Sequence, residues 1–97
     1  MSVEYHLLIE NTSLDDVFNK IRAAFENSEL YFLSYFNNSS LGISISGSSS
    51  IWGADFEVSY ADGGFFIEIH SGNSKRILLF IKSILNDNNI IFEIEEI

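Results

Sequence analysis

The feature that most constrains the fold is a pair of alternating segments joined by a short turn. Residues 55–60 (DFEVSY) and 65–70 (FFIEIH) alternate between apolar and polar side chains, and residues 61–64 (ADGG) join them. A period of two is typical of a β-strand that buries one face. The Asp-Gly pair favours a type I′ turn, in which both central residues take a positive φ. We therefore predict a two-residue β-hairpin.

The register of this hairpin follows by counting outward from the turn. One face then consists of apolar pairs, which are Tyr60–Phe65, Val58–Ile67 and Phe56–Ile69. The other face pairs Ser59 with Phe66, Glu57 with Glu68 and Asp55 with His70. A uniformly apolar face makes this register self-consistent. A loop of three or four residues would instead move Glu57 and Glu68 off direct opposition.

Similar patterns predict the other elements. Residues 3–10 alternate like a strand, and apolar residues at helical spacing predict a helix over 14–27. Ser13 and Asp16 resemble a capping box at the start of this helix. Further strands are predicted over residues 30–36, 41–46, 55–60, 65–70 and 90–95, and a second helix between residues 74 and 86. Residues 51–53 either begin another strand or form a bulge.

These elements predict an α+β fold. Its core is a single, mostly antiparallel sheet of five to six strands, with two helices packed on one face. The predicted order is β-α-β-β-(β)-β-β-α-β, and residues 1–97 form a single domain. Each helix has one apolar stripe and several strands are polar on one side, so we expect the second sheet face to be free.

Charge and composition exclude several classes of function. The chain has 14 acidic and five basic residues, for a net charge of −9. Binding to nucleic acids or to anionic membranes needs Lys and Arg, so we expect neither. Cysteine is absent, which excludes disulfides, thiolate metal sites and cysteine nucleophiles. We find no pattern of a signal peptide or membrane span, and we expect a cytoplasmic protein.

The pair formed by Glu57 and Glu68 is the strongest functional signal. Like charges directly opposed on a sheet destabilise it, so we interpret the pair as retained for a basic protein partner. Phe66 on the same face is the expected aromatic anchor. The predicted partner-binding residues are Asp55, Glu57, Phe66, Glu68 and His70, with Trp52, Glu93 and Glu95 added from elsewhere in the chain. The alternative is that these acids are solvated charges that keep the protein soluble.

Other candidate sites have weaker patterns. His6 and His70, together with Asp55, Glu57 or Glu68, could bind a metal or act as an acid/base pair. The two histidines lie on different predicted strands without metal-ligand spacing, so we predict no metal, no cofactor and no catalytic residue. Residues 72–76 (GNSKR) form either an anion site at a helix N-terminus or an ordinary N-cap by Asn73 or Ser74. Trp52 is either a core residue or a partner contact, and the serine-rich segment 46–50 is a loop that could also contact a partner.

In its small size, acidity, lack of cysteine and α+β layout, the chain resembles a bacterial toxin-immunity protein. Such proteins are the cognate inhibitors of contact-dependent or polymorphic secreted toxins. The resemblance implies a cytoplasmic, non-catalytic inhibitor that covers the active site of a basic toxin, expected to be a nuclease. The alternatives are a nucleic-acid-mimicking anti-defence protein of the anti-restriction or anti-CRISPR type, or a small ligand-binding α+β domain. We expect a monomer or a weak homodimer formed through an edge strand.

Overall fold

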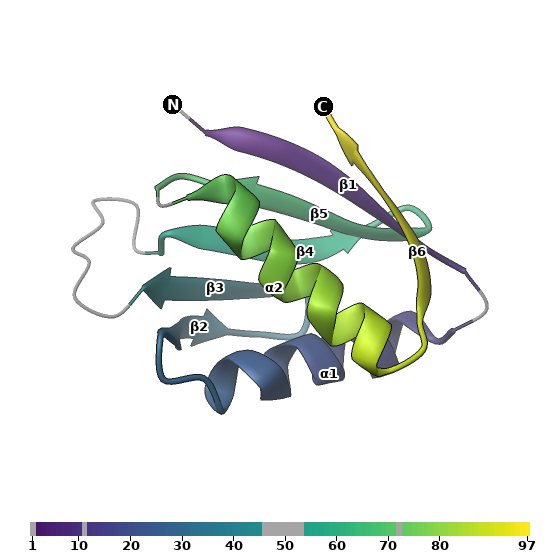
Figure 1. The fold of residues 1–97 in the computed structure, drawn as a ribbon, viewed down its shortest axis with the longest axis horizontal. Coiled ribbons are helices and arrows are strands. Elements are labelled where there is room, and N and C mark those ends of the chain that lie inside the picture. The colour runs from purple at the N-terminus through teal and green to yellow at the C-terminus, as the bar shows by residue number, and fades with distance from the viewer. Residues whose placement is uncertain (1, 11, 46–53, 72) are drawn as a thin grey trace.

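The eight elements of the structure form one sheet and two helices (Figure 1). The computed structural model describes residues 2–10, 12–45, 54–71 and 73–97. Its elements are β1 (Val3–Glu10), α1 (Leu14–Glu26), β2 (Tyr31–Phe36), β3 (Ser40–Ile45), β4 (Phe56–Ala61), β5 (Gly64–Ile69), α2 (Ser74–Asp87) and β6 (Ile91–Glu96). All strand pairs are antiparallel, in the order β2-β3-β4-β5-β1-β6. The predicted α+β fold is confirmed.

Both helices cover the same face of the sheet, as Figure 1 shows. The ring of Phe25 on α1 lies 5.4 Å from that of Phe56 on β4, 5.3 Å from that of Tyr31 on β2 and 5.0 Å from that of Phe80 on α2. These aromatic contacts join both helices to the inward side chains of the sheet, and burial of this area is the main stabilising contribution. The sheet face away from the helices is called the open face below.

The β4–β5 hairpin has the predicted register, but its turn is of another type. The Cα pairs run from Phe56 opposite Ile69 to Ala61 opposite Gly64. Gly63 has a φ of 73°, whereas Asp62 has no positive φ, which excludes type I′. A single positive φ at the second central residue is the requirement of a type II turn. The carbonyl of Gly63 also accepts a hydrogen bond from the amide of Ile9 at 3.0 Å, so β1 helps to hold this turn.

The two helices begin differently. Ser13 occupies the N-cap position of α1 but makes no side-chain cap hydrogen bond, so the capping box predicted with Asp16 is wrong. The side chain of Asn73 accepts a hydrogen bond from the amide of Arg76 at 3.1 Å, which confirms the N-cap interpretation for α2. No helix in the described part of the chain combines the length and apolar character needed to cross a membrane.

A β-bulge in β2 decides which of its aromatic side chains reach the open face. Leu33 pairs with Ile43 and Tyr35 pairs with Gly42, so Ser34 is the extra residue. Simple alternation would put Tyr35 on the helix side; the bulge turns it to the open face instead. Phe36 consequently turns toward α1, where its ring lies 6.2 Å from that of Phe18.

Gly64 offers a direct test of this packing. A Cβ at Gly64 would overlap the carbonyl oxygen of Leu7 on β1, and backbone atoms cannot move aside as a side chain can. We expect Gly64→Ala to lower the free energy of unfolding by about 2 kcal/mol, measured by urea denaturation. The matched control is Gly63→Asn, because Asn tolerates a positive φ; its loss should be about 0.5 kcal/mol. Equal losses in the two variants would contradict the pairing of Gly64 with β1.

Candidate functional site

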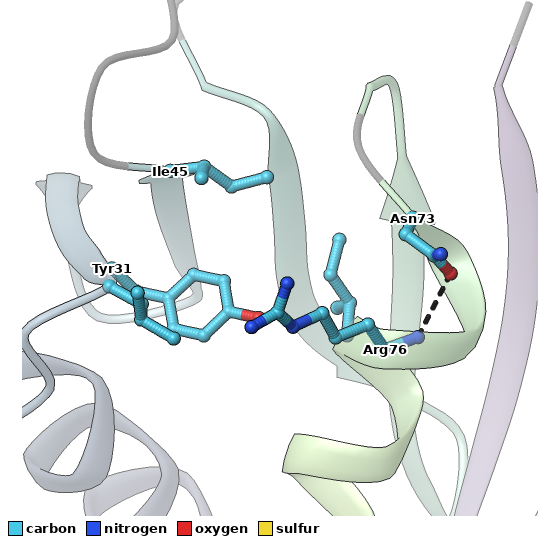
Figure 2. Close-up of a pocket in the computed structure, with 6 residues that line it drawn as sticks. Tyr31, Ile45, Asn73 and Arg76 are labelled. Atoms are coloured by element: carbon cyan, nitrogen blue, oxygen red, sulfur yellow. Dashed lines mark hydrogen bonds between the residues drawn. The ribbon is translucent and has the colours of Figure 1, made fainter.

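One hollow of the structure lies beside the start of α2 (Figure 2). Its volume is about 120 Å³, and it is lined by Leu30, Tyr31, Ile45, Asn73, Arg76 and Ile77. Sites for drug-sized ligands enclose roughly 300–1,000 Å³. The backbone amide of Arg76 already donates to the Asn73 side chain, so this amide is not free to hold an anion. The hollow therefore gives no support to the anion-site alternative.

The open face carries a row of facing residues that crosses five strands. Tyr35 on β2 faces Gly42 on β3, which faces Glu57 on β4, then Glu68 on β5 and Glu4 on β1. Residues that are Cα partners lie on the same face of a sheet. We call this line the central row. It places three glutamates of three neighbouring strands side by side.

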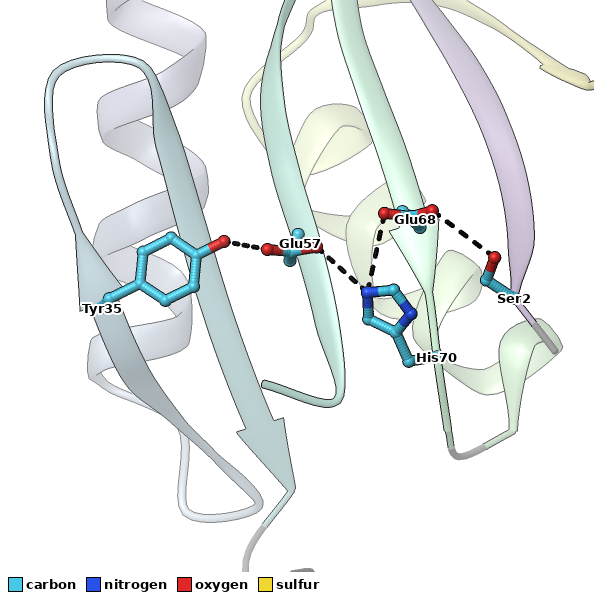
Figure 3. A network of polar contacts seen from close by, with 5 residues as sticks. All are labelled: Ser2, Tyr35, Glu57, Glu68 and His70. Carbon is cyan, nitrogen blue, oxygen red and sulfur yellow. Dashed lines mark hydrogen bonds and ion pairs between the residues drawn. The ribbon is translucent and has the colours of Figure 1, made fainter. Parts of the chain in front are cut away.

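Gly42 gives Tyr35 its access to the central row. A Cβ at Gly42 would overlap the Tyr35 ring, so the ring lies across the space that a larger residue would fill. From this position the Tyr35 hydroxyl donates a hydrogen bond to Oε1 of Glu57 (Figure 3). The glycine and the bulge at Ser34 together bring a phenol from the sheet edge to a carboxylate two strands away.

His70 lies between the two opposed carboxylates, as Figure 3 shows. It follows directly after β5, and its Nε2 is 3.0 Å from Oε2 of Glu57 and 3.6 Å from Oε1 of Glu68. Its side chain is 11% exposed, against 32% for Glu57 and 29% for Glu68. Direct opposition of the two glutamates is thus confirmed. The sequence pattern did not predict that His70 would contact both glutamates within the chain.

This network sets the ionisation of its members. Burial raises the pKa of Glu57, but hydrogen bonds from Tyr35 and His70 lower it by more than burial raises it. The pKa of Glu57 therefore lies below its ordinary value. Burial, the hydrogen bond to Glu57 and the charge of Glu57 raise the pKa of Tyr35 to about 12. At neutral pH Glu57 is therefore a carboxylate and Tyr35 a neutral hydrogen-bond donor.

Asp55 differs from its predicted role in partner binding. It is fully buried, its carboxylate accepts a hydrogen bond from the amide of Ile45 at 2.7 Å, and the Ser71 hydroxyl donates to its other oxygen. Its backbone carbonyl accepts from the amide of His70 at 2.8 Å. Asp55 therefore joins the end of β3 to the segment after β5 and is not part of the exposed acidic surface. It also fixes the backbone position of His70.

The predicted residues of β6 do lie on the open face. Glu93 and Glu95 are exposed and face Leu8 and His6 of β1, whose neighbour Glu4 belongs to the central row. Alternation along the strands puts six glutamates on this face: Glu4, Glu10, Glu57, Glu68, Glu93 and Glu95. All five basic residues lie on helices, with Lys20 and Arg22 on α1 and Lys75, Arg76 and Lys82 on α2. The charge of the sheet therefore has a single sign.

Phe66 lies on the open face as predicted, and two further aromatic residues of that face are more exposed. Phe66 is only partly exposed, with Ser59 and His6 as its cross-strand neighbours. Phe32 and Tyr35 on the edge strand β2 are 48% and 36% exposed. The bulge at Ser34 is what places Tyr35 on the open face, and no turn or alternation pattern in the sequence signals it. Trp52 and the segment 46–50 lie outside the described residues.

The two histidines have separate surroundings. His6 Nε2 is 3.1 Å from the carbonyl oxygen of Asp62, while His70 contacts Glu57 and Glu68. Ligand atoms of Glu57, Glu68 and His70 all lie within 4.8 Å of one another. The predicted register places these three residues on one face of the sheet. Their contact was not predicted, because the direction of the His70 side chain does not follow from strand spacing.

Comparison with known proteins gives no match, whether against protein-family models, curated proteins or solved structures. The function of this chain is therefore inferred from its own residues, above all from the open face.

Titration of Tyr35 tests the network. We expect Glu57→Gln to lower the pKa of Tyr35 from about 12 toward 10.0, because the charge of its hydrogen-bond acceptor is removed while burial remains. The ¹³Cζ chemical shift of Tyr35 between pH 9 and 11 reports its ionised fraction. Glu93→Gln is the matched control and should leave this fraction unchanged. An unchanged titration in Glu57→Gln would mean that Tyr35 does not contact Glu57 in solution.

Proposed function

We propose that this protein is a non-catalytic inhibitor that binds a basic protein partner through the open face of its sheet. The observation that carries this proposal is the separation of charge: the open face has six glutamates, and every Lys and Arg lies on a helix. A surface of one sign attracts a partner of the opposite sign and speeds its encounter. Among the described residues, no helix covers this face (Figure 1).

The open face also offers apolar area for contact. Tyr35 in the central row and Phe32 opposite Ser44 are both exposed on this face. Aromatic side chains are frequent among the residues that dominate binding energy, because they bury a large area with few rotatable bonds. In this proposal the edge strand β2 supplies the apolar contact, and the glutamates supply steering and orientation.

The six glutamates do not contribute equally. The carboxylates of Glu57 and Glu68 contact His70, and Glu57 also accepts a hydrogen bond from Tyr35, so their charge is partly compensated within the chain. Glu93 and Glu95 are exposed, and no Lys or Arg shares their face. The exposed glutamates of β6 are therefore the better test of charge complementarity. Reversing Glu57 and Glu68 would also remove the contacts of His70 and Tyr35.

The resemblance to toxin-immunity proteins suggests the identity of the partner. A nuclease toxin has a basic active site because it binds phosphates, and glutamates on the open face would occupy the positions of those phosphates. Inhibition would follow from coverage of that site in the cytoplasm. A host-defence protein that binds nucleic acid would present a similar basic surface. Identification of the partner therefore distinguishes the toxin inhibitor from the nucleic-acid mimic.

The test begins with capture of the partner from the native host by the tagged chain. The captured protein is then purified, and its affinity for the chain is measured by calorimetry together with its enzymatic activity. We expect a basic enzyme that is inhibited at a one-to-one ratio. We expect Glu93→Lys combined with Glu95→Lys to weaken binding at least tenfold, about 1.4 kcal/mol, and the affinity to fall as salt is raised.

Asp87→Lys is the matched control for charge reversal. Asp87 is exposed at the end of α2, on the helix layer, and a lysine there is favourable to the helix dipole. Its affinity should therefore stay within about twofold of the unmodified chain, apart from a small long-range effect. Equal affinity of the β6 double variant and the unmodified chain would remove the open face as the binding surface. A captured nucleic-acid-binding defence protein would favour the mimic function over the toxin inhibitor.

A further inference from the structure

We propose that Glu57, Glu68 and His70 form a binding site for a divalent transition-metal ion of the Zn²⁺ class on the open face. The site goes beyond the partner-binding function proposed above and does not depend on it. It is built from one residue of β4, one of β5 and the residue that directly follows β5. These three residues converge on a single point of the face, as Figure 3 shows.

The spacing of the three ligand atoms fits a metal ion. Nε2 of His70 lies 3.0 Å from Oε2 of Glu57 and 3.6 Å from Oε1 of Glu68. Metal–ligand bonds of about 2.0–2.2 Å in tetrahedral geometry separate neighbouring ligand atoms by roughly 3.3–3.6 Å. One measured separation lies just below this range and the other at its upper end. All three ligand atoms lie within 4.8 Å of one another, so small side-chain rotations would bring them around one ion.

The other oxygen of each carboxylate is held by a hydroxyl from outside the three ligands. The Tyr35 hydroxyl donates to Oε1 of Glu57, and the Ser2 hydroxyl donates to Oε2 of Glu68 at 3.4 Å. Each glutamate thus presents one oxygen to His70 while a hydroxyl from elsewhere in the chain orients the other (Figure 3). Outer-shell hydrogen bonds of this kind orient metal ligands and raise affinity.

The donor set selects the class of ion. One imidazole nitrogen and two carboxylate oxygens suit Zn²⁺ and its neighbours, whereas Mg²⁺ and Ca²⁺ prefer oxygen ligands alone. Three protein ligands leave a fourth position for water or for a donor atom of a partner. The same three atoms are also compatible with a simple ion pair between a charged imidazole and two carboxylates, and the experiment must separate the two.

Calorimetric titration of the full chain with Zn²⁺ near pH 7.5 is the direct test. We expect one ion per chain with a dissociation constant on the order of micromolar, and a weaker or absent response to Mg²⁺. His70→Gln should weaken Zn²⁺ binding at least tenfold, and Glu68→Gln should do the same. His6→Gln is the matched control, because it removes the other histidine from the same face of the sheet, and it should bind as the unmodified chain does.

A second measurement guards against variants that fail to fold. Co²⁺ bound by one nitrogen and two oxygen ligands gives visible absorption, which reports an occupied site. The variant Tyr35→Phe keeps all three ligands and removes only the hydroxyl that donates to Glu57. We expect this variant to retain the Co²⁺ spectrum with a loss of affinity of about tenfold or less. The proposal is overturned if Zn²⁺ does not bind at millimolar concentration, or if His70→Gln, folded by circular dichroism, binds as tightly as the unmodified chain. Loss of binding in His6→Gln would also overturn it.

Discussion

The contact of His70 with two opposed glutamates is the interaction around which the open face is arranged. Antiparallel register places Glu57 directly opposite Glu68, and the Nε2 of His70 meets an oxygen of each. Like charges in such positions destabilise a sheet, and a hydrogen-bond donor between them offsets part of their repulsion. Because Asp55 holds the backbone of His70, this compensation also depends on a carboxylate buried within the fold.

The sequence predicts most of the fold because its signals are local. The Asp62-Gly63 turn and the alternation around it determine the β4–β5 register, although the turn itself is not type I′. The turn is not isolated, since the amide of Ile9 on β1 donates a hydrogen bond to the carbonyl of Gly63. Helix positions follow in the same way from apolar spacing, whereas the missing Ser13 cap shows that a suitable residue type does not ensure the hydrogen bond.

The candidate site is less predictable because it depends on contacts between distant residues. A bulge at Ser34 and the absence of a side chain at Gly42 bring Tyr35 to Glu57, and neither is visible in a period-two pattern. Asp55 has the same alternation as Glu57, but it is buried, and its carboxylate accepts hydrogen bonds from the amide of Ile45 and the hydroxyl of Ser71. The pairing of β4 with β5 could be predicted by counting from the turn, whereas the direction of the side chains at the strand ends could not be predicted.

The most direct test of the account is a double-mutant cycle between Glu68 and His70, measured as free energies of unfolding in urea. Glu68→Gln removes both the repulsion from Glu57 and the contact with His70. In the unmodified chain we therefore expect the free energy of unfolding to change little or to fall. In the His70→Gln background only the repulsion is removed, so the same change should stabilise the fold. The account predicts a coupling of about 1 kcal/mol between the two residues. Identical effects of Glu68→Gln in both backgrounds would contradict it.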